Sequence, residues 1–263
     1  MNWKEIDTYA KHWIKEAGER IRASFGLELT VETKSNANDL VTNMDKATEE
    51  FFYEKINQQF PEHRILGEEG VGEIIQDLKG IVWIIDPIDG TINFVHQQRN
   101  FAISIGIFED GVGKIGLIYD VVHDELYHSF KGGGAFMNGI RLPDLKPVPV
   151  KETILAINAS WINSNKLIPK EKLIKLVSDV RGTRSTGSAA LELAYVAAGR
   201  YDAYVTLRLS PWDYAAGLLL VQEVGGAVTD VYGNDIDFLK KSSIFASRPG
   251  LHEEMIDTYF KNE

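Results

Sequence analysis

The chain has 263 residues, of which 44% are apolar and 25% are charged, a composition typical of a soluble globular protein. Its net charge is −10 at pH 7 with no run of Lys or Arg, which argues against nucleic-acid binding, and no apolar stretch approaches the roughly 20 residues needed to cross a bilayer. It has no cysteine, which excludes disulfides, thiol nucleophiles and Cys-zinc sites, and its charged N-terminus lacks a signal sequence, so we expect a cytoplasmic protein.

Apolar spacing predicts the secondary structure of the first half of the chain. Helices are expected over 3–23 and 45–60, with an exposed loop at 34–44 between them. Strands are expected over 64–66, 81–85, 101–108, 114–121 and 125–130. Residues 111–116 spell G-x-G-x-x-G, but a strand pattern follows them instead of a helix, so no dinucleotide fold is predicted there.

A proline-rich segment, PDLKPVP at 143–149, marks the expected boundary between two parts of the chain. Beyond it, strand and helix patterns alternate. Strands are expected over 154–158, 203–207, 227–230 and 244–246, and helices over 170–178, 188–198, 212–224 and 251–260. We therefore expect an α+β part over residues 1–147 and an α/β part over 148–263.

The most informative stretch is IVWIIDPIDGT, which ends in two aspartates separated by a turn-like sequence. Its β-branched run predicts a buried strand, and Pro87 and Gly90 predict that this strand ends at Asp86. Asp86 and Asp89 would then lie at the end of a buried strand. Unpaired carboxylates are unfavourable there, and oxygen ligands suit Mg²⁺. Two solvated aspartates in a capped turn are the alternative interpretation.

Other candidate residues have simple structural explanations when each is taken alone. Asp45 and Asp213 fall in the first turn of predicted helices, where the helix dipole favours a carboxylate. Glu68 and Glu69 stand between glycines, as solvated surface residues often do. The segment STGSAA at 185–190 opens a helix, and it suits either an anion on free N–H groups or close packing of small residues.

Taken together, these stretches resemble the inositol monophosphatase family of Mg²⁺-dependent, lithium-sensitive phosphatases. The matching pieces occur in the family's order across nearly the whole chain: GEE at 67–69, DPIDGT with NF at 86–94, RSTGSAA at 184–190 and WDYAAG at 212–217. The resemblance implies a layered αβαβα sandwich of α+β or α/β class with mixed β-sheets. It also implies a homodimer that hydrolyses a small phosphate monoester.

The resemblance assigns the metal ligands, for two to three Mg²⁺ ions per site. Glu68, Asp86 and the carbonyl of Ile88 are expected to bind the first ion. Asp86, Asp89 and Asp213 are expected to bind the second, and a third, weaker ion is expected beside Glu68. Most of these ligands belong to the part over 1–147, and the part over 148–263 contributes Asp213 and substrate contacts.

The resemblance also assigns catalytic and substrate-binding residues. Asp45, Glu69 and Thr91 are expected to orient water, and Lys34 stands where the family often carries a lysine near this site. Substrate contacts are expected from Gly90, Thr91, Gly187, Ser188, Ala189, Thr206 and Arg208.

The substrate itself is left open. Inositol-preferring members commonly carry a glutamate where this chain has Thr206, and Arg208 is either a clamp for a second phosphate or carboxylate or an exposed surface arginine. The predicted function is hydrolysis of inositol monophosphate or a related sugar or polyol phosphate by metal-activated water. Fructose 1,6-bisphosphate, NADP and adenosine 3′,5′-bisphosphate are alternative substrates. A slow-turnover regulatory protein that binds a phosphate ligand is an alternative of a different class.

Overall fold

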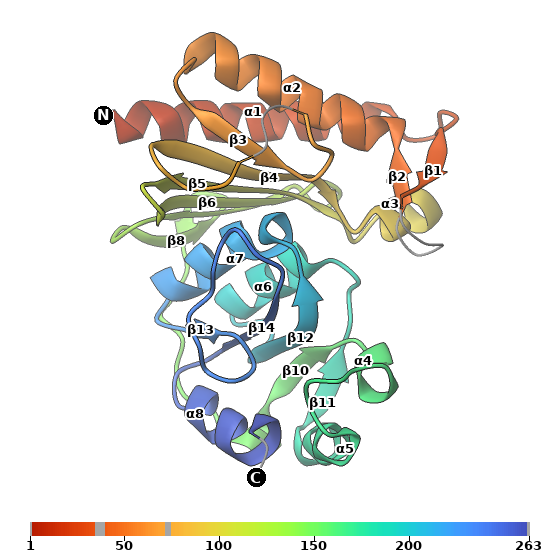
Figure 1. The fold of residues 1–263 in the computed structure, drawn as a ribbon, viewed down its shortest axis with the longest axis vertical. Coiled ribbons are helices and arrows are strands. Elements are labelled where there is room, and N and C mark those ends of the chain that lie inside the picture. Colours follow the sequence, from red (N-terminus) through yellow and green to blue (C-terminus); the bar gives the residue numbers. More distant parts are fainter. Residues whose placement is uncertain (1, 35–39, 72–74, 262–263) are drawn as a thin grey trace.

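Helices and sheets alternate in five layers, in the order helix, sheet, helix, sheet, helix (Figure 1). The computed structural model describes residues 2–34, 40–71 and 75–261. The arrangement confirms the predicted αβαβα sandwich with mixed sheets. The division into parts over 1–147 and 148–263 stays a prediction, and its boundary falls in the irregular segment that follows strand β9.

The larger sheet has seven strands in the order β3-β4-β5-β6-β7-β8-β9, and only β3 and β4 are parallel among its neighbouring pairs in the described chain. Its strands are β3 (Arg64–Gly67), β4 (Ile81–Asp89), β5 (Ala102–Glu109), β6 (Val112–Asp120), β7 (Glu125–Phe130), β8 (Gly134–Met137) and β9 (Ile140–Arg141). Helices α1 (Trp3–Ala23) and α2 (Asn43–Gln59) cover its outer face (Figure 1).

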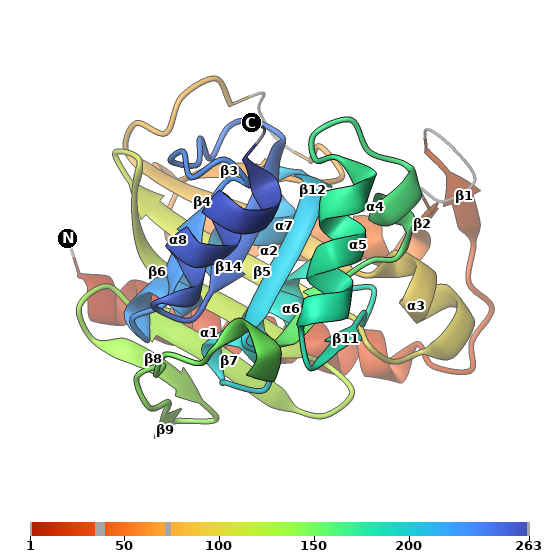
Figure 2. The same cartoon turned by 90° about the horizontal axis from the view of Figure 1, so that it is seen from below.

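The smaller sheet has five strands in the order β11-β10-β12-β14-β13. Its strands are β10 (Ile154–Ile157), β11 (Gly182–Arg184), β12 (Ala203–Leu209), β13 (Ala227–Thr229) and β14 (Ser242–Ser247). Its outer face carries helices α5 (Lys170–Asp179) and α8 (Leu251–Met255), which lie on either side of β12 in Figure 2. A π-helical turn, η2 (Ile256–Phe260), follows α8.

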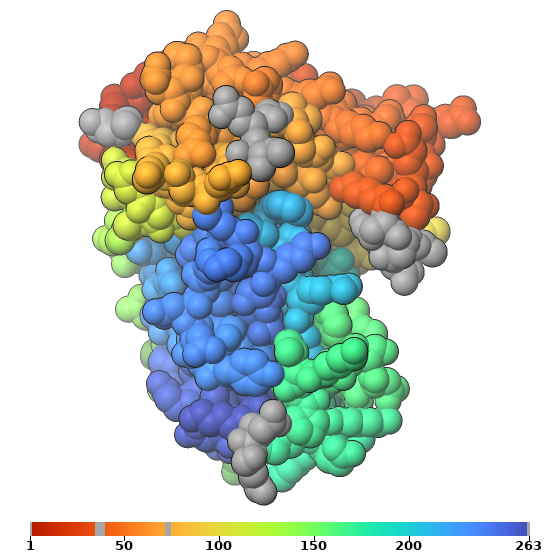
Figure 3. All heavy atoms as spheres, viewed as in Figure 1, coloured from red at the N-terminus to blue at the C-terminus, as the bar shows by residue number. Residues whose placement is uncertain are grey.

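Helices α6 (Ala189–Ala197) and α7 (Pro211–Glu223) form the middle layer between the two sheets (Figure 1). Close approach of α7 to the larger sheet requires glycine on β6, since a Cβ at Gly116 would lie 2.6 Å from the carbonyl oxygen of Ala216. In Figure 3 the first half of the chain (red to yellow) stacks on the second half (green to blue). The remaining elements are β1 (Val31–Thr33), β2 (Leu40–Thr42), α3 (Thr91–Gln97), η1 (Val150–Glu152) and α4 (Ser160–Asn163).

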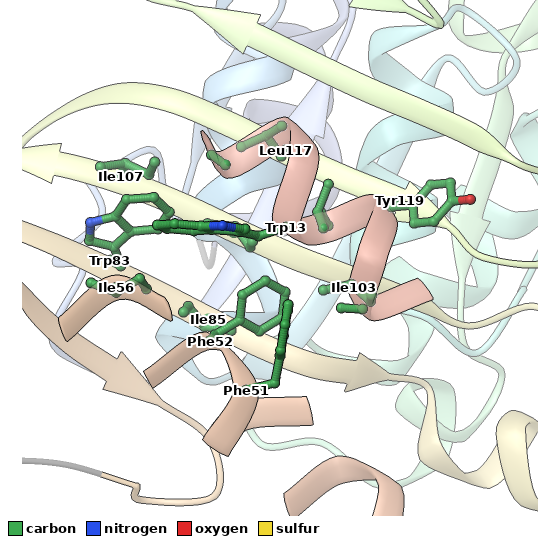
Figure 4. Packing of buried hydrophobic residues seen from close by; sticks show 14 of the residues in the cluster. Trp13, Phe51, Phe52, Ile56, Trp83, Ile85, Ile103, Ile107, Leu117 and Tyr119 are labelled. Atoms are coloured by element: carbon green, nitrogen blue, oxygen red, sulfur yellow. The ribbon is translucent and has the colours of Figure 1, made fainter. Parts of the chain in front are cut away.

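Strand β4 lies in the core, and every one of its residues is buried. Its side chains alternate: Trp83 packs against α1 and α2 in the cluster drawn in Figure 4, whereas Val82 and Ile84 contact residues of α7 on the opposite face. The Trp83 ring lies 5.9 Å from that of Trp13. A strand buried on both faces explains the continuous apolar run in the sequence.

The predicted end of this strand was wrong. Strand β4 continues through Asp86 and Pro87 to Asp89, because Asp86 pairs with Ser104 and a shift in register follows before Asp89 pairs with Ala102. Pro87 lies within this irregular stretch, where no ladder hydrogen bond from its nitrogen is needed.

Several other boundaries also differ from prediction, among them the following three. The predicted loop at 34–44 contains β2 and the start of α2, whose capping box joins Thr42 and Asp45, and residues 35–39 of that loop lie outside the described chain. The connection between the strands predicted over 101–108 and 114–121 is shorter than expected. It consists of Asp110 and Gly111, because β6 already begins at Val112. The last predicted helix is α8 followed by the π-helical turn η2.

Candidate active site

The irregular end of β4 presents two of the predicted metal ligands. Asp86 and Asp89 are buried, and Asp86 Oδ1 accepts a hydrogen bond from the Ile88 amide at 3.0 Å. Asp213, in the first turn of α7, joins them from the second half of the chain. One carboxylate oxygen from each of these three residues lies within 4.8 Å of the others. The structure therefore brings Asp213 next to Asp86 and Asp89, which lie more than 100 residues earlier in the sequence.

Asp213 keeps the capping role that its position suggests. Its Oδ2 accepts a hydrogen bond from the Ser210 amide at 2.7 Å, completing a capping box at the start of α7. The cap fixes the rotamer of the carboxylate at the end of a helix that packs on β4. The structural and the functional interpretation of Asp213 are thus compatible.

The electrostatics of this cluster favour a bound cation. Burial and the charges of Glu68, Asp89 and Asp213 raise the pKa of Asp86 well above its usual range. Burial also raises the pKa of Asp89 to about 6, and burial and the charge of Asp89 raise that of Asp213. Hard oxygen donors whose negative charges repel one another are the donor set that Mg²⁺ prefers. The residues present therefore fit the expected metal.

The N-terminus of α6 accommodates an anion, one of the two interpretations of the STGSAA segment, and that anion is a side chain of the protein. The Ala190 amide donates to Asp89 Oδ2 at 2.7 Å, and the Ser188 hydroxyl donates to the same oxygen. Gly90 and Gly187 permit this close approach. A Cβ at Gly90, whose φ is +96°, would lie 3.3 Å from the carbonyl oxygen of Gly187.

A buried glutamate that the sequence analysis missed supports the same loop. Glu192 Oε1 accepts a hydrogen bond from the Thr186 amide at 2.6 Å, while Asn93 Nδ2 donates to the Thr186 carbonyl at 2.8 Å. Burial raises the pKa of Glu192 to about 7. The backbone N–H and the carbonyl of Thr186 are therefore both held, one from each half of the chain.

Thr91 and Asp45 lie together next to β4. Thr91 Oγ1 is 3.2 Å from Asp45 Oδ1 and 3.1 Å from the Ile88 carbonyl oxygen, so its proton can be donated to either acceptor. Asp45 Oδ2 accepts the Thr42 amide at 2.8 Å, and burial of Asp45 raises the pKa of its carboxyl group. Thr91 and Asp45, two of the residues expected to orient water, are thus in contact.

Glu68 and Glu69 follow β3 and share one cation. Lys34 Nζ lies 3.0 Å from Glu68 Oε1 and 2.6 Å from Glu69 Oε1. Burial raises the pKa of Glu69 to about 7, although Lys34 acts in the opposite direction. Burial alone would lower the pKa of Lys34, but the two glutamates outweigh this effect and raise it. Lys34 and Glu68 line one pocket together with Asp213 of the acidic cluster.

A second buried glutamate, Glu49 of α2, anchors this segment. Its two carboxylate oxygens accept the amides of Glu69 and Val71, each at 2.8 Å. A Cβ at Gly67 would lie 2.4 Å from that carboxylate, so the contact requires glycine there. Glu49 was not predicted as a site residue, although its spacing to Phe52 places it on the buried face of the predicted helix.

Two adjoining pockets open beside the acidic cluster. One, of about 240 Å³, is lined by Asp89 and Asp213 together with the predicted substrate contacts Gly187, Ser188, Ala189, Thr206 and Arg208. Asn158, Trp161, Glu192 and Tyr204 line it as well and were not predicted. The other, of about 300 Å³, shares Arg208, Leu209 and Asp213 with the first and adds Lys34, Glu68 and Lys241. Gly90 lies behind the first pocket, against Gly187.

A layered sandwich in which both halves of the chain contribute carboxylates to one buried cluster has the donor set for a divalent metal ion. The chain belongs to the inositol monophosphatase family, whose model matches residues 2–262, and it is a phosphoric monoester hydrolase. Within the described residues, no helix is long and apolar enough to cross a membrane.

Individual relatives agree with this membership. The inositol-1-monophosphatase of Bacillus subtilis strain 168 is 62% identical, over 98% of this chain and 97% of its own length. The inositol monophosphate-bound structure of SaIMPase-II, a Staphylococcus aureus protein, has a TM-score of 0.88 and 41% identity, with 97% and 93% of the two chains covered. An IMPase/NADP phosphatase complexed with Mg²⁺ and phosphate has a TM-score of 0.91 and 30% identity, covering 100% and 97%.

Proposed function

We propose that the protein is a Mg²⁺-dependent phosphatase of inositol monophosphate or a related small sugar or polyol phosphate. The observation that carries this proposal is the gathering of Asp86, Asp89 and Asp213 within 4.8 Å at the edge of an open pocket. The relatives that are named inositol-1-monophosphatase or that bind inositol monophosphate support the substrate class.

The proposed metal ligands follow the resemblance and fit the donor chemistry. Glu68, Asp86 and the Ile88 carbonyl would hold one Mg²⁺, and Asp86, Asp89 and Asp213 a second. A third, weaker ion would lie beside Glu68. When bound, the ions neutralise phosphoryl oxygens, lower the pKa of water and stabilise a departing alkoxide. A Mg²⁺ complex of a family member supports the identity of the metal.

The chain's own residues would position the attacking water. Thr91 Oγ1 donates its proton to Asp45 Oδ1 or the Ile88 carbonyl, which leaves its lone pairs free to accept a hydrogen bond from water. Asp45 is a suitable proton acceptor because burial raises the pKa of its carboxyl group. Glu69, beside Lys34, would orient the same water from a second direction. Direct attack by water needs no covalent nucleophile, which agrees with a chain that lacks cysteine.

The proposed substrate contacts come mostly from the C-terminal half. Ser188 and Ala189 at the start of α6, with Thr206 on β12, face the pocket beside Asp89. These groups offer hydroxyl and amide partners for the hydroxyls of a polyol ester. A water held near Asp89 or Asp213 would protonate the leaving oxygen.

The experiment is phosphate release, with and without Mg²⁺, from inositol 1-phosphate, glycerol 2-phosphate, fructose 1,6-bisphosphate, NADP and adenosine 3′,5′-bisphosphate. Asp86→Asn is the test variant, and Asp144→Asn, which changes an exposed aspartate, is its matched control. Mg²⁺-dependent turnover that Asp86→Asn alone abolishes supports the mechanism. The preferred ester then decides among the substrates, and the IMPase/NADP phosphatase relative supports including the nucleotides.

A phosphate-binding regulatory protein of slow turnover is the second candidate. Mg²⁺-dependent binding of an ester without release of phosphate is the result that favours it. Against it stands the contact of Thr91 with Asp45, which a protein that only binds its ligand does not need.

Three further properties are proposed from family resemblance: a homodimer, a cytoplasmic location and inhibition by Li⁺ through replacement of the second Mg²⁺. Light scattering of the purified protein tests the first, fractionation of the source cells the second, and Li⁺ titration at several Mg²⁺ concentrations the third.

A further inference from the structure

Two cationic side chains lie at the mouth of the larger pocket and belong to neighbouring strands. Arg208 is on β12, and Lys241 immediately precedes β14. Leu209 pairs with Ser242 in antiparallel register, and the register shifts between Thr206 and Leu209, so Arg208 lies at an irregularity of β12. Arg208 and Lys241 line one pocket together with Asp213, and side chains as long as those of Arg and Lys can converge on one ligand there.

Neither cation is neutralised by a residue that the structure describes. Lys34, the third cation of this pocket, is held by Glu68 and Glu69 at 3.0 and 2.6 Å. Lys240, next to Lys241 in sequence, lies 2.6 Å from Asp237. Arg208 and Lys241, by contrast, make no hydrogen bond or ion pair with any described residue, and both are exposed. In a chain of net charge −10, two exposed, unpaired cations at one pocket mouth favour an anion there.

We propose that Arg208 and Lys241 form a subsite for a second phosphate group, so that the preferred substrates are phosphomonoesters that carry one. This inference rests on the proposed function, which places the scissile phosphoryl group at Asp86, Asp89 and Asp213. Because Asp213 and Arg208 both line each of the two pockets, a ligand at the acidic cluster extends directly toward the cationic pair.

The chemistry of the two side chains suits this role. The guanidinium of Arg208 binds phosphate oxygens through two parallel hydrogen bonds, and the ammonium of Lys241 adds a point charge. Thr206, on the same strand, is neutral, so no acidic side chain at that position repels the second phosphate. A bisphosphate of a sugar and one of a nucleoside share this chemistry, and paired substrates distinguish them.

The test compares kcat/KM at saturating Mg²⁺ for esters that differ only in the second phosphate. One pair is inositol 1-phosphate and inositol 1,4-bisphosphate, and the other is adenosine 3′-phosphate and adenosine 3′,5′-bisphosphate. The variants are Arg208→Gln, Lys241→Gln and the double variant. Lys240→Gln is the matched control, because Lys240 neighbours Lys241 but does not line the pocket. Thermal unfolding of each variant confirms that it is folded.

We expect the wild-type protein to prefer the bisphosphate of at least one pair. The double variant is expected to lower that preference by about tenfold or more, with a smaller effect in each single variant and none in Lys240→Gln. The pair that shows the preference identifies a sugar or a nucleoside as the carrier. Equal kcat/KM within both pairs, or a preference unchanged in the double variant, overturns the subsite.

Failure of the proposed function is measured separately. If no ester is hydrolysed, that function is wrong, and the subsite is then tested by calorimetric binding of the same pairs to Asp45→Asn protein with Mg²⁺. Tighter binding of a bisphosphate that depends on Arg208 and Lys241 supports the subsite. Equal affinity within both pairs overturns it.

Discussion

Asp89 Oδ2 accepts the amide of Ala190 at 2.7 Å, so a carboxylate at the end of β4 occupies the N-terminus of α6, 101 residues further along the chain. The helix dipole and the free N–H groups stabilise that carboxylate in its charged form. Burial acts in the opposite direction and raises the pKa of Asp89 to about 6. The contact therefore fixes Asp89, a proposed metal ligand, in place, but it does not fully neutralise the negative charge of the carboxylate.

Removing the hydroxyl that shares this oxygen is the first prediction. Ser188 donates to Asp89 and also accepts the Leu191 amide at 3.2 Å as the cap of α6. Ser188→Ala is expected to lower the free energy of unfolding by about 1–2 kcal/mol, because both interactions are lost. The affinity for Mg²⁺ is expected to fall several-fold, since Asp89 loses a donor that orients it. Urea unfolding and Mg²⁺ titration measure the two effects.

The matched control is Ser178→Ala, which removes an exposed hydroxyl that donates to the Ile174 carbonyl within α5. Its unfolding free energy should stay within about 0.5 kcal/mol of wild type. Unchanged stability and Mg²⁺ affinity in Ser188→Ala would show that the hydroxyl does not support Asp89.

Asp86→Asn should change stability and activity in opposite directions. Without metal, the substitution removes a buried charge that four neighbouring carboxylates disfavour, so the metal-free protein is expected to gain about 1–2 kcal/mol. With Mg²⁺, kcat/KM is expected to fall more than about 100-fold, because the residue is proposed to serve two ions. Thermal unfolding with a chelator and steady-state kinetics test both parts. A metal-free Asp86→Asn protein less stable than wild type would contradict the electrostatic argument.

Local sequence patterns account for much of the fold. The apolar face of α1 repeats at helical spacing along its whole length, and the predicted range 3–23 matches the observed helix, because an amphipathic surface helix depends mainly on its own residues. The end of β4 was predicted wrongly for the opposite reason. Pairing of Asp86 with Ser104 is a contact between separate strands, and turn-forming residues such as Pro87 do not reveal it.

The predicted site residues divide in a similar way. Asp86 and Asp89 were proposed as Mg²⁺ ligands from the buried strand pattern, whereas Asp213 joined them only through family resemblance, because alone it reads as a helix cap. Glu49 and Glu192 were missed, because glutamate is usually exposed even where helical spacing places it on an apolar face. Their roles depend on backbone amides of distant loops, at Glu69 and Thr186, which no spacing rule connects to them.

Glu49→Gln is expected to loosen the segment that carries Glu68. The two oxygens of the Glu49 carboxylate each accept an amide, and glutamine would turn an N–H₂ group toward one of those donors. We expect a loss of about 1–3 kcal/mol in unfolding free energy, and a fall in kcat/KM because Glu68 and Glu69 are displaced. Glu50→Gln, which changes an exposed glutamate one position along α2, is the control. Equal behaviour of the two variants in unfolding and kinetics would contradict the anchoring role.

The last prediction concerns the pH dependence of stabilisation by Mg²⁺. In the metal-free fold the pKa of Asp89 is raised from 3.8 to about 6, so the folded protein holds its proton more tightly than the unfolded chain does. The raised pKa does not lower the free energy of unfolding below about pH 4, where Asp89 is protonated in both states. Above pH 6, where Asp89 is charged in both states, it lowers the free energy of unfolding by about 3 kcal/mol. The raised pKa values of Asp86 and Asp213 act in the same direction.

Bound Mg²⁺ should remove that penalty. The increase in melting temperature on adding Mg²⁺ is therefore expected to be small near pH 5 and to grow toward pH 8. The difference in melting temperature between Mg²⁺ and chelator, measured at each pH, cancels the contributions of carboxylates elsewhere in the chain. One of these is Asp124, whose pKa is lowered by Lys15. The wild-type increase should disappear in Asp86→Asn at every pH. A Mg²⁺-induced shift that is constant with pH, or that shrinks as pH rises, would show that protons and metal do not compete for these carboxylates.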